Sequence, residues 1–86
     1  MIKHFEHLWE EAEIEANNYY TDEESVYNDI KNNIKDIKCN KLSDEDLYIK
    51  MGNVMFALCF LSKKYNINVY SALRDSIDDI KIALLD

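Results

Sequence analysis

The chain has 86 residues, of which 48% are apolar, with one Gly, no Pro and a formal net charge of −7 at pH 7. This length predicts a single domain over residues 1–86, and the apolar content argues against disorder. The scarcity of Gly and Pro argues against turn-rich β-architectures. The acidic charge argues against nucleic acid as a direct partner, because phosphate binding needs clustered Lys and Arg.

The start of the chain and its cysteines bear on the compartment. MIKHFEHLWEEAE is acidic and amphipathic, and it lacks the basic region and apolar run of a secretory signal. The longest apolar run, residues 54–61, is too short to span a membrane. Cys39 and Cys59 do not make a disulfide framework. We therefore predict a cytoplasmic protein with reduced thiols and no membrane partner.

Two helices are predicted in the first half of the chain. Apolar residues recur every three or four positions over residues 2–18, which is the spacing of one helical face. They are Ile2, Phe5, Trp9, Ala12, Ala16 and Tyr19. A second helix is predicted from Thr21, which pairs with Glu24 as a capping box. Its apolar stripe is Val26, Tyr27, Ile30, Ile34 and Ile37, and the polar residues 38–41 end it.

The third helix has the clearest start. Ser43 is the predicted N-cap, with Asp46 three residues later, and the helix is expected to run to about residue 65. Its second half, VMFALCFL, is apolar all round, as expected of a helix surrounded by others. Gly52 interrupts it at a propensity cost of about 1 kcal/mol, which we interpret as a place where two helices approach closely.

A short turn leads into the last helix. Asn66 suits the left-handed conformation that ends helices, and Asn68 suits an N-cap. The stripe that follows is Val69, Leu73, Ser76, Ile77, Ile80 and Leu84. Together these patterns predict an all-α fold, a compact four-helix bundle with short connections and mostly antiparallel neighbours.

The stretch from residue 47 to residue 73 resembles the third and fourth helices of the MazG-like, all-α nucleotide pyrophosphatase superfamily. MGNVMFAL at residues 51–58 is similar to the family's Gly and apolar stretch. YNIN at residues 65–68 is similar to its turn, and the Ala-Leu pair at residues 72 and 73 to the start of its last helix. The resemblance covers about residues 26–85, and it implies a helical bundle that forms dimers or tetramers.

The same resemblance implies where a metal would bind. The family places Glu-Glu-x-x-Glu on its second helix opposite Glu-x-x-Asp on its third, and these carboxylates bind magnesium. The matching positions here are Asn28, Asp29, Asn32, Lys50 and Asn53. Only Asp29 is a carboxylate, and Lys50 brings a cation, so we predict no metal and no cofactor. The chain would then be an inactive relative; the alternative is a nucleoside triphosphate pyrophosphatase with a rearranged metal site.

The net charge lies at one end of the chain. Residues 1–24 hold eight acids and one base, a charge of −7, whereas residues 25–86 hold nine of each and sum to zero. With nearby tyrosines, which are enriched in binding hot spots, this predicts a surface for a basic protein partner. The candidate residues are Glu6, Glu10, Glu11, Glu13, Tyr19, Tyr20, Glu23 and Glu24. The other reading is a solvated acidic face with tyrosines ringing the core.

The predicted function is therefore a small, non-enzymatic protein-binding module with no catalytic residues. An inhibitor, an immunity-type protein or a phage anti-defence protein fits its size and charge. We also expect a homodimer, because a chain this short buries too little surface to be more than marginally stable alone and its third helix is apolar all round.

Overall fold

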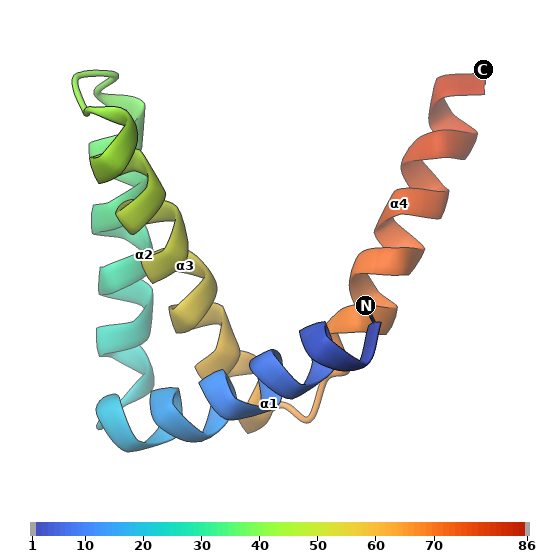
Figure 1. Cartoon of the computed structure of the whole chain (residues 1–86), viewed down its shortest axis with the longest axis horizontal. Helices are drawn as coiled ribbons and strands as arrows, with labels where there is room; N and C mark the ends of the chain where they lie inside the picture. The colour runs from blue at the N-terminus through green and yellow to red at the C-terminus, as the bar shows by residue number, and fades with distance from the viewer. Residues whose placement is uncertain (1, 86) are drawn as a thin grey trace.

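The fold is known from a computed structural model, which describes the backbone of residues 2–85 and the side chains of residues 6–85. Within this range it has four α-helices and no strand (Figure 1). They are α1 (Ile2–Tyr19), α2 (Glu23–Lys38), α3 (Asp44–Lys64) and α4 (Val69–Leu85). The predicted all-α fold of four helices is confirmed. Ile2 and Phe5, which the sequence places on the stripe of the first helix, lie outside the described side chains.

The start of α2 differs from the predicted one. Asp22, not Thr21, is the N-cap, and its carboxylate accepts a hydrogen bond of 2.7 Å from the backbone N–H of Ser25. The predicted capping box of Thr21 and Glu24 is therefore wrong. A carboxylate at this position also meets the positive end of the helix dipole. The hydrogen bond from Ser25 lowers the pKa of Asp22.

The two later caps form as predicted. The hydroxyl of Ser43 accepts a hydrogen bond of 3.2 Å from the backbone N–H of Asp46 at the start of α3. The side chain of Asn68 accepts one of 3.0 Å from the N–H of Ser71 at the start of α4. Asn66 has φ 53°, the left-handed conformation expected of it. These residues satisfy backbone groups that helix ends leave without partners.

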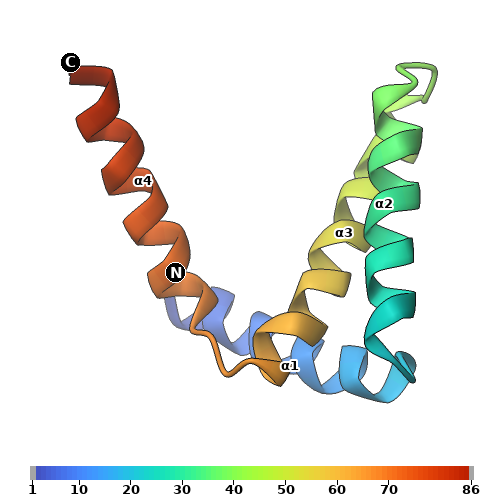
Figure 2. The same cartoon turned by 180° about the vertical axis from the view of Figure 1, so that it is seen from behind.

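Three helices pack together. α2 and α3 lie side by side as an antiparallel pair, and α1 crosses their lower end and packs on α3 (Figures 1 and 2). The buried core is small and lies where the three helices meet. It consists of Ala16, Tyr20, Val26, Ala57 and Cys59, with Trp9, Ala12, Ile30, Phe56, Phe60 and Leu61 partly buried around it.

The fourth helix extends away from this packed part. α4 leaves the end of α3 beside the start of α1 and points outward, so that the molecule has the outline of a V (Figures 1 and 2). Every residue from 71 to 85 is exposed. The radius of gyration is 14.7 Å, compared with about 12 Å expected for a compact domain of this length.

Two further features bear on the predictions. A Cβ atom at Gly52 would meet nothing within 4 Å, so the interpretation of Gly52 as a close approach of two helices is wrong for the helices of residues 2–85. None of the helices within residues 2–85 combines the length and the apolar character that crossing a membrane requires.

Candidate functional site

A hydrogen-bonded junction fixes α1 on the end of α3. The indole N–H of Trp9 donates to the hydroxyl oxygen of Ser62 at 3.0 Å. That hydroxyl lies 2.6 Å from a carboxylate oxygen of Glu13 and 2.9 Å from the carbonyl of Cys59. The hydroxyl has one proton, and the shorter distance favours Glu13 as its acceptor. Ser62 is only 6% exposed, so these hydrogen bonds are shielded from water and fix α1 on α3. Trp9, Glu13 and Ser62 also line a cleft.

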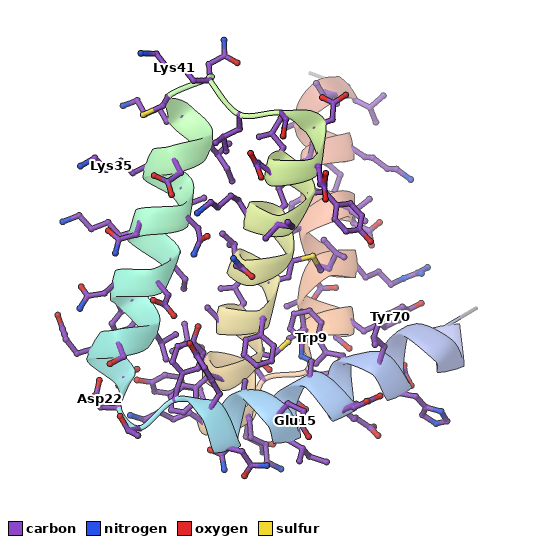
Figure 3. All side chains as sticks on the ribbon, turned by 60° about the vertical axis from the view of Figure 1, so that its left-hand side comes forward. Trp9, Glu15, Asp22, Lys35, Lys41 and Tyr70 are labelled. Atoms are coloured by element: carbon purple, nitrogen blue, oxygen red, sulfur yellow. The ribbon has the colours of Figure 1, made fainter. Side chains whose placement is uncertain are left out.

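The cleft lies between α1, the end of α3 and the start of α4. Its volume is about 310 Å³. The lining residues are Glu6, Trp9, Glu10, Glu13, Ser62, Lys63, Asn66, Ile67, Asn68, Val69 and Tyr70. The four from α1 stand at positions i, i+3, i+4 and i+7 and so share one helical face. Figure 3 shows Trp9 and Tyr70 at this junction, on α1 and α4 respectively. Three carboxylates face one lysine there, which makes the cleft acidic.

The other predicted partner-binding acids lie outside this cleft. Glu11 and Glu24 are exposed, and neither lines the cleft. Glu23 accepts hydrogen bonds from the ammonium of Lys64 at 2.7 Å, from the hydroxyl of Tyr65, and from the hydroxyl of Tyr27 at 2.7 Å. These three donors, Lys64 first, lower the pKa of Glu23 to about 2. Glu23 thus ties the start of α2 to the end of α3.

The two predicted tyrosines have different environments. Tyr20 is 8% exposed, and its hydroxyl donates to Asp29 at 2.9 Å. Burial, followed by this hydrogen bond, raises the pKa of Tyr20. Its ring packs edge-on against Phe60, with centroids 5.8 Å apart. Tyr19 is 68% exposed and meets Tyr20 edge-on at 4.9 Å. Tyr19 is therefore the tyrosine available to a partner, and Tyr20 belongs to the core.

The positions that match the family's metal motif do not form one site. Asp29 and Asn53 line a second cleft of about 360 Å³, together with Tyr19, Tyr20, Asn33 and Phe56. The amide of Asn53 donates to the side-chain oxygen of Asn33 at 3.3 Å. Lys50 forms an ion pair of 2.9 Å with Asp36. Asn28 and Asn32 are exposed and line neither cleft.

The chemistry available to these groups is limited. Among the residues that the structure describes, no group of three or more His, Cys, Asp or Glu side chains is placed to hold a metal ion. Burial, with the charge of Glu13 adding to it, raises the pKa of the Cys59 thiol to about 11, so this thiol stays protonated and unreactive at neutral pH. The acidic cleft offers carboxylates and aromatic rings, which suit recognition of a cation.

Sequence reasoning missed several residues of this region. Ser62 is the first polar residue after the apolar run of residues 54–61, and that position was the available signal for a buried polar contact. Lys63 lines the cleft because α1 packs on α3, and Tyr70 lines it because the turn after α3 brings the start of α4 there. No local pattern in the sequence shows either placement. Asn33 follows the matched motif residue Asn32 in the sequence, and it is Asn33 rather than Asn32 that lines the second cleft.

Fold and site together define a small all-α protein with an acidic cleft between α1, the end of α3 and the start of α4. Comparisons of the chain with protein-family models, with curated proteins and with solved structures found no match.

Proposed function

We propose that this protein is a non-enzymatic binding module whose acidic cleft receives an arginine or lysine side chain of a partner protein. One observation carries the proposal: three carboxylates of α1, those of Glu6, Glu10 and Glu13, line one cleft together with aromatic residues of α1 and α4.

The chemistry of the cleft favours a basic side chain over other ligands. A guanidinium or ammonium group is attracted by carboxylates and also by the faces of Trp and Tyr rings, and Trp9 and Tyr70 are both present. The volume of about 310 Å³ is enough for one long side chain and small for a nucleotide-sized ligand. The charge of −7 on residues 1–24 would also steer a basic protein toward this end of the molecule.

This function places the protein among small acidic inhibitors, immunity-type proteins or phage anti-defence proteins. Such a protein acts by covering a basic surface of its target. The exposed Tyr19 and the exposed acids Glu11 and Glu24 would lie at the edge of the contact, where charges mainly affect the association rate.

A matched pair of substitutions on α1 tests the proposal. Glu10 and Glu11 are adjacent and both exposed, but only Glu10 lines the cleft. Binding of a nine-residue arginine peptide is measured through the fluorescence of Trp9, the only tryptophan. We expect Glu10→Gln to weaken binding about tenfold, the loss of one charge-assisted hydrogen bond, and Glu11→Gln to weaken it much less.

Two outcomes would overturn this assignment. Equal weakening by Glu10→Gln and Glu11→Gln would show general attraction to an acidic surface rather than binding in the cleft. Peptide binding without any change in Trp9 fluorescence would place the contact elsewhere.

The alternative of a nucleoside triphosphate pyrophosphatase has less support. Asp29, the one carboxylate at the matched positions, accepts the hydrogen bond of Tyr20, and Lys50 pairs with Asp36. Incubation with nucleoside triphosphates and Mg²⁺ or Mn²⁺ tests it directly. Release of pyrophosphate that is lost in Asp29→Ala would replace the binding function with an enzymatic one.

A further inference from the structure

Two apolar stripes with matching spacing remain exposed on different helices. The α3 stripe consists of Tyr48, Met51, Met55 and Leu58, whose exposed fractions run from 42% to 82%. The α4 stripe consists of Leu73, Ile77, Ile80 and Leu84, with exposed fractions from 45% to 80%. Successive members are three or four residues apart, which is the spacing of helices that pack along their length. Each stripe has the pattern of a buried face, but the part of the chain that the structure describes does not cover it.

The stripes also match in length. At about 1.5 Å of rise per residue, the α3 stripe spans about 15 Å and the α4 stripe about 17 Å. The charged residues of α4 lie around the rest of the helix. They are Arg74, Asp75, Asp78, Asp79 and Lys81. The helix is thus amphipathic, which is typical of a helix that packs on another surface rather than one that is solvated all round.

Hydrogen bonds define both ends of the connection between α3 and α4. The N–H of Ile67 donates to the carbonyl of Ser62 at 2.9 Å, and that of Asn66 to the carbonyl of Lys63 at 3.3 Å. This pair of bonds, with Asn66 in the left-handed conformation, is a Schellman motif. Asn68 caps α4 immediately afterwards. α4 leaves this connection pointing away from α3, so the two stripes of one chain do not meet (Figures 1 and 2).

We infer that a second copy of this chain covers both stripes, with the α4 of each copy lying on the α3 stripe of the other. The arrangement is a symmetric exchange of α4, in which every contact occurs twice. This inference does not depend on the proposed function of the acidic cleft, because no stripe residue lines that cleft. Charge permits it, because the excess of −7 lies on residues 1–24, whereas residues 25–86, which carry both stripes, have no net charge.

The area of the contact favours exchange over pairing of α4 with α4. A half-exposed side chain of this size presents roughly 50 Å² to solvent. Reciprocal contacts cover all eight stripe residues of both copies, about 800 Å² before flanking residues are counted, which approaches the ~1,000 Å² of the smallest specific interfaces. Pairing α4 with α4 would cover about half as much and would leave the α3 stripe exposed.

Complementary substitutions test the exchange by light scattering across a range of concentrations. We expect a dimer for the unmodified protein. Met55→Lys on the α3 stripe and Ile77→Asp on the α4 stripe should each weaken dimerisation by about 100-fold, because each places a charge in an apolar contact. Mixing the two variants should restore a heterodimer, since it contains one unmodified contact and one that pairs Lys with Asp. Ile82→Asp, outside the α4 stripe, is the control and should remain dimeric.

Other results would overturn the exchange. A strict monomer at high concentration would contradict it. A dimer that survives Met55→Lys but is lost in Ile77→Asp would also contradict it, because that pattern indicates pairing of α4 with α4. Should either charged variant lose its helical circular dichroism, variants with one exposed cysteine replace them, in which the buried Cys59 is kept. Met55→Cys and Ile77→Cys, each made with Cys39→Ser, should give a mixed disulfide when combined and oxidised; homodimeric disulfides alone would contradict the exchange.

Discussion

The packed helices α1–α3 and the extended helix α4 differ in what covers their apolar side chains. All four helices carry an apolar stripe, yet the fully buried residues, such as Ala16, Val26 and Ala57, belong to α1, α2 and α3. In α4 even the central Ile77 is 45% exposed. An amphipathic pattern therefore predicts that a helix has something to pack on, but not whether that surface belongs to the same chain.

The connections explain the difference. The loop between α2 and α3 reverses the chain, with Asn40 in the left-handed conformation at φ 57°, and lays the two helices side by side (Figure 2). The turn between α3 and α4 also contains a left-handed residue, Asn66, but the chain continues outward. A left-handed Asn is thus followed in one case by a helix that packs on its predecessor and in the other by a helix that points away from it. The direction of the next helix depends on the rest of the turn and on the surface available for packing.

Introducing an Asp should destabilise the packed region strongly and leave the stability of α4 almost unchanged. Val26 is fully buried and Ile82 is 62% exposed. Val26→Asp would bury a charge without a counter-ion, which destabilises by about 3–5 kcal/mol, of the order of the total stability of a small domain. We expect loss of cooperative unfolding in Val26→Asp, measured by circular dichroism during heating, and a melting temperature within a few degrees of the original in Ile82→Asp. A large loss in Ile82→Asp would mean that α4 is covered on all sides.

The positions of the helices could be predicted from sequence because the signals are local. Ser43 and Asn68 cap α3 and α4 as their neighbours in the sequence indicate, and each helix carries a stripe of its own. The start of α2 was misplaced because Thr21 and Asp22 are adjacent and both have side chains that can cap. The carboxylate of Asp22 takes that role, and only the backbone geometry distinguishes the two.

The contacts of the acidic residues could not be predicted, because their partners come from distant parts of the chain. Glu13 meets Ser62 and Glu23 meets Lys64, separations of 49 and 41 residues. The sequence shows that both acids belong to the acidic first 24 residues. It did not show that Glu13 joins the cleft or that Glu23 stabilises the junction of α2 and α3, since both depend on how the helices pack.

Lowering the pH should weaken the packed part through Glu23. Its pKa is lowered to about 2 from an ordinary value near 4.5, chiefly by Lys64. A lowered pKa in the folded state stabilises the fold above the ordinary value, and this stabilisation is lost as the pH falls from about 4.5 to about 2. We expect the urea midpoint to drop over that interval, and Glu23→Gln to flatten the drop while lowering the midpoint at pH 7.

Glu24→Gln is the control for this measurement, because Glu24 is the exposed neighbour of Glu23. An identical acid profile in both variants would contradict the role of Glu23. The hydrogen bond between Tyr27 and Glu23 should make stability depend on pH at the alkaline end as well, where stability falls as the pH rises. The hydrogen bond to Glu23 raises the pKa of Tyr27 to about 12, so its contribution to stability is lost as the pH rises from about 10 to about 12.

Gly52→Ala should change the stability least of these variants, because Gly52 lies on the uncovered face of α3. Its Cβ would meet nothing within 4 Å, and replacing a mid-helix Gly by Ala stabilises a helix by about 1 kcal/mol or less. We expect a higher urea midpoint, measured at a low protein concentration at which the chain is monomeric. Asn32→Ala, at an exposed position of α2, is the control and should raise the midpoint in the same way. A lower midpoint would mean that the Cβ meets a neighbour after all.

The same variant sharpens the location of the contact between copies. Gly52 lies four residues after Tyr48 and three before Met55, so it borders the α3 stripe. If the α4 of a second copy lies closely over Gly52, the added methyl group should weaken association while it stabilises the monomer. Two opposing changes in one variant would then explain why a glycine stands in the middle of an otherwise strong helix. Association that stays unchanged would instead place the contact further along the α3 stripe, toward Leu58.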